Sequence, residues 1–148
     1  MKVGVLGAGT MGAGIAQVAA QAGHQVVLVD VNSEVLDKAK KNLVNVLDRL
    51  VEKGKLSAAD SGEIRNRFTY STSTSDFSTC GIVIEAIVEN ISIKHSVFKE
   101  LESIVSEKCI LASNTSSLPI ASIGSALKDP SRIIGIHFFN PAPLMPLV

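Results

Sequence analysis

Polar side chains suited to acid–base chemistry follow several short apolar segments of this sequence. His137 and Asn140 come after the apolar run 132–136, and Glu89 comes after the run 82–87. A histidine titrates near neutral pH, so it can take the proton of a hydroxyl group and later return it. We therefore interpret His137 as the general base of an alcohol oxidation, with a structural histidine between aromatic neighbours as the alternative.

Hydroxyl and amide groups complete this candidate catalytic set. Ser116 lies in the polar run 113–117, which follows another apolar segment. Ser116 and Asn140 can hold a substrate oxygen by hydrogen bonds and so present a hydroxyl group to the base. Side chains of these types also cap helices, so the alternative is that residues 114–117 only cap the next helix.

A glycine motif near the N-terminus predicts a dinucleotide site. Residues 7–12 read GxGxxG, follow the apolar run 2–6 and open a predicted helix. In that context the glycines allow a tight turn, a close approach of a pyrophosphate and close helix packing, and the helix N-terminus binds the pyrophosphate. A purely structural turn is the alternative. The expected contacts are Gly7, Gly9, Thr10, Met11 and Gly12.

An acidic residue closes the second predicted strand. Asp30 follows the apolar run 25–29, at the distance from the glycines where such sites place a carboxylate on the adenine ribose. The carboxylate would repel a 2′-phosphate, and no basic residue follows before Lys38, so we expect NAD rather than NADP. A cap or turn residue is the alternative interpretation of Asp30.

The elements that must position these residues alternate along the chain. We predict strands at 2–6, 25–29, 68–71, 82–87, 109–112 and 132–136, and helices at 11–22, 33–53, 57–67, 93–105 and 119–127. Near-continuous apolar strands indicate a mostly parallel sheet covered on both faces, and right-handed crossovers make it an α/β doubly wound fold. Ligands bind at the carboxyl ends of such strands, so the candidate residues should gather at one edge.

A helical hairpin over about 33–67 is longer than a crossover between parallel strands requires. We predict Ser33 as the N-cap of its first helix and Gly54 as the residue that ends that helix. The Ser/Thr-rich stretch 71–79 is predicted to be a loop or short turn. The whole chain, 1–148, is predicted to be one domain.

Composition excludes several classes of protein. The formal net charge is zero, so we expect no nucleic-acid partner and no anionic membrane surface. Charged residues make up 19%, below the usual ~25%, as in a domain that docks against another part. Cys80 and Cys109 are predicted to be buried reduced thiols, and no motif predicts a metal site. Without a signal peptide or a membrane-length apolar run, we expect a cytoplasmic protein.

Four segments in order carry a resemblance to a known family. They are 7–14 (GAGTMGAG), 85–90 (EAIVEN), 113–117 (SNTSS) and 137–143 (HFFNPAP). The chain resembles the L-3-hydroxyacyl-CoA dehydrogenase family over its whole length, hairpin included. The resemblance implies a Rossmann-type NAD-binding domain and the oxidation of an L-3-hydroxyacyl-CoA, as in the family's 3-hydroxybutyryl-CoA dehydrogenases, to the 3-ketoacyl-CoA and the reverse.

The resemblance also implies roles for individual residues. His137 matches the family's catalytic base, and Ser116 and Asn140 match its contacts to the substrate oxygen. Glu89 and Lys94 match positions near the nicotinamide half of the cofactor.

Three further residues are assigned from their neighbourhood. Asn114, in the same polar run as Ser116, is counted among the cofactor contacts. Because the hairpin lies near the CoA in this family, Lys53 and Lys55 are candidate contacts to the CoA phosphates. Solvated lysines at a helix end are the alternative for both.

Members of the family continue past this sequence. They carry an all-helical C-terminal domain that provides most of a homodimer interface and part of the acyl-CoA site, and a glutamate paired with the histidine directly after the match to Leu147 and Val148. We therefore expect a fragment that binds NAD but has weak or no activity, with an apolar tail prone to self-association. The alternatives are a non-catalytic dinucleotide-binding module and a hydroxy-acid dehydrogenase that does not use CoA.

Overall fold

A computed structural model of the protein describes all residues, 1–148. Its sheet has six strands in the order β3-β2-β1-β4-β5-β6, and every neighbouring pair is parallel. This order, which reverses beside β1, confirms the predicted doubly wound sheet. The strands are β1 (Lys2–Leu6), β2 (Gln25–Val29), β3 (Phe68–Ser71), β4 (Ile82–Glu85), β5 (Ile110–Ser113) and β6 (Ile133–Gly135).

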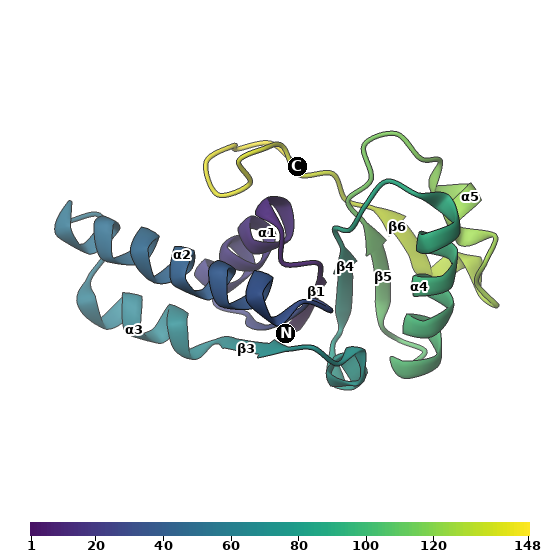
Figure 1. The fold of residues 1–148 in the computed structure, drawn as a ribbon, viewed down its shortest axis with the longest axis horizontal. Coiled ribbons are helices and arrows are strands. Elements are labelled where there is room, and N and C mark those ends of the chain that lie inside the picture. The colour runs from purple at the N-terminus through teal and green to yellow at the C-terminus, as the bar shows by residue number, and fades with distance from the viewer.

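Helices cover both faces of the sheet, with α1, α2 and α3 on one side and α4 and α5 on the other (Figure 1). The α-helices are α1 (Thr10–Gln21), α2 (Ser33–Glu52), α3 (Ala58–Asn66), α4 (Ile91–Ile104) and α5 (Ile120–Gly124). The short 3₁₀ helices are η1 (Thr74–Thr79) and η2 (Pro130–Arg132). No helix combines the length and the apolar character that crossing a membrane requires.

The apolar strands feed two separate cores because successive side chains of a strand point to opposite faces. In β2, Val26 and Leu28 pack with α1, α2 and α3, whereas Val27 and Val29 pack with α4 and with Phe77 of η1. These four side chains are all buried. The sheet is therefore a layer packed on both faces between the two groups of helices.

The predicted hairpin is confirmed as α2 and α3, which project beyond the sheet (Figure 1). The predicted N-cap was wrong by one residue. Asn32 is the N-cap, because its side chain accepts the hydrogen bond from the backbone N–H of Glu34, and Ser33 is the first helical residue. Gly54, at φ 64°, follows the end of α2 as predicted.

Most other boundaries shift by one or two residues, but the last helix, predicted over 119–127, ends at Gly124, three residues early. The fourth strand ends at Glu85 and not at Ile87, because the N–H of Ile87 donates to the Glu85 side chain instead of a neighbouring strand. The stretch predicted as a loop over 71–79 contains the 3₁₀ helix η1.

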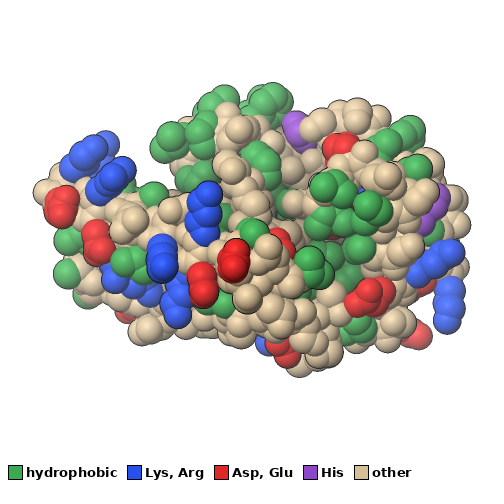
Figure 2. Space-filling view, in the orientation of Figure 1, with side chains coloured by type: hydrophobic (Ala, Val, Ile, Leu, Met, Phe, Trp, Pro, Cys, Tyr) green, Lys and Arg blue, Asp and Glu red, His purple; other side chains and the backbone are tan.

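The last residues cross over α1 (Figure 1). A Cβ atom on Gly14 would lie 3.2 Å from Pro143, so the C-terminal segment packs closely on this helix. Beyond that contact Leu144, Leu147 and Val148 are exposed. Figure 2 shows hydrophobic side chains gathered over this segment, in agreement with the expected apolar tail.

Candidate active site

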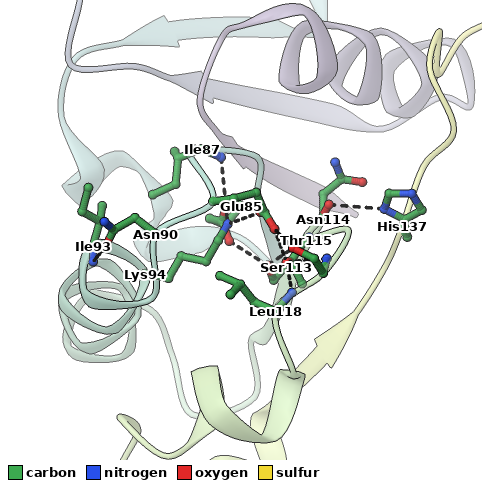
Figure 3. Close-up of polar contacts among 12 residues, drawn as sticks. Glu85, Ile87, Asn90, Ile93, Lys94, Ser113, Asn114, Thr115, Leu118 and His137 are labelled. Carbon is green, nitrogen blue, oxygen red and sulfur yellow. Dashed lines mark hydrogen bonds and ion pairs between the residues drawn. The ribbon is translucent and has the colours of Figure 1, made fainter.

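All strands run in one direction, so their carboxyl ends meet at one edge of the sheet. The glycine loop, the loop after β4, the loop after β5 and the segment after β6 lie at this edge, and Figure 3 shows the last three side by side. The predicted gathering of polar residues is therefore present.

The glycine loop has the backbone that its sequence predicts. Gly7 has φ 99°, a conformation that other residues rarely adopt, and its N–H donates to the carbonyl of Val29 at 2.8 Å. A Cβ atom on Gly12 would lie 1.8 Å from the carbonyl oxygen of Gly7, so only glycine lets α1 start this close to β1. At Gly9 a Cβ atom would meet nothing within 4 Å, which leaves room above the loop.

The N-terminus of α1 fits the phosphates of a dinucleotide. Its N-cap is Gly9, which offers no capping side chain, and the first turn holds no acidic residue. The first N–H groups of a helix have no intrahelical partner, and the helix dipole adds positive potential there. An anionic ligand would satisfy donors that the chain itself leaves free.

Asp30 joins the second strand to the glycine loop. Its Oδ2 accepts a hydrogen bond from the N–H of Ala8 at 2.8 Å, and its Oδ1 accepts one from Asn32 at 2.9 Å. The carboxylate borders a pocket of about 640 Å³ whose walls include Gly7, Gly9, Val31, Ile87 and Ile93. A polar carboxylate at the rim of a mostly apolar pocket suits a nucleoside, with its ribose at Asp30 and its base among the apolar side chains.

His137 is exposed just after β6. Its Nδ1 lies 3.4 Å from the carbonyl oxygen of Asn114, and its ring meets Phe139 edge to face at 5.4 Å between centroids (Figure 3). A carbonyl oxygen only accepts hydrogen bonds, so a hydrogen bond here places a proton on Nδ1, and in the neutral imidazole the Nε2 lone pair is then free. The imidazole is thus oriented with a proton acceptor available to a ligand.

The side chain of Asn114 is engaged within the protein. Its Oδ1 accepts a hydrogen bond from the N–H of Phe138 at 2.8 Å. Together with the carbonyl contact to His137, this bond ties the loop after β5 to the segment after β6. The sequence predicts Asn114 as a cofactor contact, and in the structure its side-chain oxygen holds the protein backbone.

Ser116 and Asn140 are both exposed at this same edge. Capping does not account for Ser116, because α5 begins at an N-cap, Pro119, that has no side-chain cap. Thr115 instead supports the local turn by accepting a hydrogen bond from the N–H of Leu118 at 3.0 Å.

Glu89 lies next to this loop, as predicted from the order of the strands, and Lys94, which was assigned only from the resemblance, lies beside Glu89. Glu89 accepts hydrogen bonds from the hydroxyl groups of Thr115, at 2.6 Å, and Ser117, at 3.2 Å. Desolvation raises the pKa of Glu89, but the hydrogen bonds from Thr115 and Lys94 and the Lys94 charge outweigh it, so the pKa lies below its ordinary value. Glu89 is therefore an anion at neutral pH.

The sequence did not reveal how Lys94 is held. Its side chain is only 1% exposed, and its Nζ lies 2.6 Å from Glu85 Oε1 and 3.2 Å from Glu89 Oε1. Glu85 was not among the predicted site residues, although it is a fully buried acid at the end of an apolar strand. Such a burial signals a paired charge, and that signal was available in the sequence.

Lys53 and Lys55 lie apart from this edge. Both are exposed in the connection between α2 and α3, at the tip of the hairpin (Figure 1). The structure does not bring them next to His137 or the glycine loop.

Comparison with known proteins identifies relatives over the whole chain. The family model described as "3-hydroxyacyl-CoA dehydrogenase, NAD binding domain" matches residues 2–148. The probable 3-hydroxybutyryl-CoA dehydrogenase of Deinococcus radiodurans is 51% identical over 100% of this chain and 53% of its own length. The fatty acid oxidation complex subunit alpha of Psychrobacter cryohalolentis is 44% identical, over 99% of this chain and 20% of its own length.

A solved structure agrees with the fold. The crystal structure of 3-hydroxybutyryl-CoA dehydrogenase from Escherichia coli K12 superposes with a TM-score of 0.96 at 40% identity. The matched region covers 98% of this chain and 31% of the E. coli chain. The chain described here thus spans about half the length, or less, of the relatives it matches.

Proposed function

This chain belongs to the 3-hydroxyacyl-CoA dehydrogenase family as an NAD-binding domain, and we propose that the whole protein oxidises an L-3-hydroxyacyl-CoA with NAD and catalyses the reverse reaction. The proposed substrate is 3-hydroxybutyryl-CoA, which stands in the names of several relatives. The observation that carries the proposal is the meeting, at one sheet edge, of His137 with the loop after β5 and the glycine loop.

In the proposed reaction the chain's own residues bind, orient and move a proton. Asp30 and the first turn of α1 hold the adenosine ribose and the pyrophosphate of NAD, and the bound nicotinamide supplies the hydride acceptor. His137 takes the substrate hydroxyl proton on Nε2, the ring atom that its contact with Asn114 leaves unprotonated. Ser116 and Asn140 donate hydrogen bonds to the substrate oxygen as it becomes a carbonyl oxygen.

The rest of the whole protein contributes to this proposal. Because the chain spans 53% of the length of one relative, we propose that the remainder completes the acyl-CoA site and forms a homodimer interface. Lys53 and Lys55 are proposed contacts to the CoA phosphates from the tip of the hairpin. Sedimentation of the whole protein tests the dimer, and a monomer at assay concentration would contradict it.

Turnover of the whole protein with NAD and 3-hydroxybutyryl-CoA tests the central proposal. His137→Gln is expected to lower kcat about 10²–10⁴-fold, because it removes the general base, while NADH affinity stays unchanged. His24→Gln is the matched control, since His24 precedes β2 at the opposite edge of the sheet. Full activity of His137→Gln would exclude His137 as the general base, and NADH binding without any turnover in the wild-type protein would favour a non-catalytic binding module. Oxidation of free 3-hydroxybutyrate but not its CoA thioester would indicate a different hydroxy-acid dehydrogenase.

A further inference from the structure

Five side chains, from two strand ends, the two loops that follow them and one helix, form a closed ring of hydrogen bonds (Figure 3). Glu85 accepts from the Lys94 ammonium at 2.6 Å through Oε1, and from the Ser113 hydroxyl at 2.7 Å through Oε2. Lys94 also pairs with Glu89, which accepts from the Thr115 hydroxyl. The N–H of Thr115 donates to the Ser113 oxygen at 3.2 Å and closes the ring.

The two halves of this ring differ in exposure. Glu85 and Ser113 are fully buried and Lys94 nearly so, whereas the Glu89 side chain is 41% exposed. Glu85 therefore cannot touch a ligand and acts only through the groups that it holds. Both of its carboxylate oxygens accept hydrogen bonds from the protein. Oε1 accepts from Lys94 and also from the N–H of Ile87, at 2.8 Å, and Oε2 accepts from Ser113.

A buried ion pair is a weak source of folding stability, because desolvating the charges offsets much of their attraction. Its specific effect is geometric. The Glu85 carboxylate fixes the backbone after β4 through Ile87, the first turn of α4 through Lys94 and the loop after β5 through Ser113. Three segments at the sheet edge thus share one anchor.

The position of the Glu85 carboxylate in the sheet indicates which half of a bound dinucleotide the three segments would face. In the proposed binding mode the adenosine ribose lies at Asp30, directly after β2, and the pyrophosphate at the loop after β1. In the sheet, β4 and β5 lie on the far side of β1 from β2. A dinucleotide bound across the edge therefore places its other half over the loops after β4 and β5.

We propose that Glu85 is a positioning residue whose buried carboxylate holds Lys94 and the loop after β5 in the arrangement that receives the nicotinamide half of NAD. The proposal rests on the proposed function of this domain. It predicts that breaking the anchor weakens recognition of the nicotinamide half and leaves recognition of the adenosine half unchanged.

Two variants of the whole protein break the anchor in different ways. Ser113→Ala removes one neutral link, and Glu85→Gln removes the charge opposite Lys94. Glu102→Gln is the matched control, because Glu102 also bridges two segments through its carboxylate but lies at the end of α4, away from this edge. Calorimetric titrations with NADH and with ADP-ribose, which lacks nicotinamide, separate the two halves of the ligand.

For Ser113→Ala and Glu85→Gln we expect NADH affinity and kcat to fall about tenfold or more. The affinity for ADP-ribose should change less than about twofold. Ser113→Thr, which restores the hydroxyl group, should recover NADH affinity. Equal losses for both ligands would show a merely structural role, and unchanged NADH affinity would show no role; either result overturns the proposal.

Binding and turnover measurements on the wild-type protein distinguish a failure of this inference from a failure of the proposed function. If wild type binds NADH but does not oxidise the CoA thioester, the proposed reaction is wrong, and the ligand comparison still decides the role of Glu85. If wild type binds ADP-ribose but not NADH, a nicotinamide site is excluded and the inference fails with it.

Discussion

The Oδ2 atom of Asp30 lies 2.8 Å from the backbone nitrogen of Ala8, so the end of β2 is hydrogen-bonded to the glycine loop after β1. One carboxylate therefore stands at the proposed ribose position and also fixes the glycine loop, the proposed pyrophosphate site. The sheet order brings this about, because β1 and β2 are neighbours in register, with Leu6 opposite Val29.

Replacing Asp30 should change both affinity and cofactor preference. In Asp30→Ala we expect NADH affinity to fall about tenfold, since hydrogen bonds to a charged acceptor are lost. NADPH should be disfavoured less than in wild type, because the repulsion of a 2′-phosphate disappears. Fluorescence titration with both nucleotides measures the ratio. Asp37→Ala, which removes an exposed carboxylate one turn into α2, should leave that ratio unchanged.

Gly9 and Gly62 form a matched pair for testing the pyrophosphate site. At either position an added Cβ atom would have no neighbour within 4 Å, and Gly9 has an extended backbone, φ −64° and ψ −174°, that alanine also adopts. Gly9→Ala should lower NADH affinity about tenfold or more by occupying the space above the loop, with unfolding free energy within about 1 kcal/mol of wild type. Gly62→Ala, inside α3, should raise stability by about 0.5–1 kcal/mol and leave binding intact. Unchanged NADH binding in Gly9→Ala would contradict the assignment.

Gly12 should respond differently from Gly9. Because its Cβ would lie 1.8 Å from the Gly7 carbonyl oxygen, Gly12→Ala must push α1 away from β1. We expect a loss of about 1–3 kcal/mol in unfolding free energy, measured by urea denaturation, together with weaker NADH binding. Wild-type stability in this variant would mean that the helix start moves freely.

The sequence predicted the sheet and the loops because the strands are short, nearly continuous apolar runs and the glycines stand directly after the first of them. It placed the N-cap of α2 one residue late, because Asn32 and Ser33 are both good N-caps and only the observed bond to Glu34 decides between them. It missed Glu85 as a site residue. An acidic residue within an apolar strand is evident in the sequence. Its pairing with Lys94, however, depends on how α4 packs across the sheet, which no local sequence pattern encodes.

The two cysteines should be unreactive in the folded protein. Both are buried and free, and burial raises the pKa of the Cys80 thiol to about 11, with Lys2 lowering it slightly and Cys109 raising it. The thiolate is the reactive form, so at about pH 8 a disulfide reagent should react slowly with native protein and fast after unfolding. Absorbance of the released thiol measures both phases. A fast phase in native protein would show that one thiol is accessible.

Lowering the pH should weaken the contact that Glu102 makes between α4 and the segment before β6. This carboxylate accepts hydrogen bonds from the backbone N–H groups of Lys128, at 2.9 Å, and Asp129, at 3.0 Å. Desolvation raises its pKa, but these bonds and the charge of Arg132 outweigh it, so the pKa lies below the ordinary value. A lowered carboxyl pKa adds stability above the unfolded-state pKa, and that stability is lost as pH falls through the folded-state pKa.

Glu102→Gln should therefore destabilise the protein at about pH 7 and less at about pH 3, because the wild-type carboxyl loses its charge as the pH falls through its lowered folded-state pKa. Urea denaturation at both pH values gives the difference in unfolding free energy. The exposed Glu107, replaced by Gln, should show a smaller difference at either pH, because its side chain makes no hydrogen bond to the backbone. If the loss of unfolding free energy in Glu102→Gln stayed constant down to about pH 3, the interaction would not depend on the charge of this carboxylate.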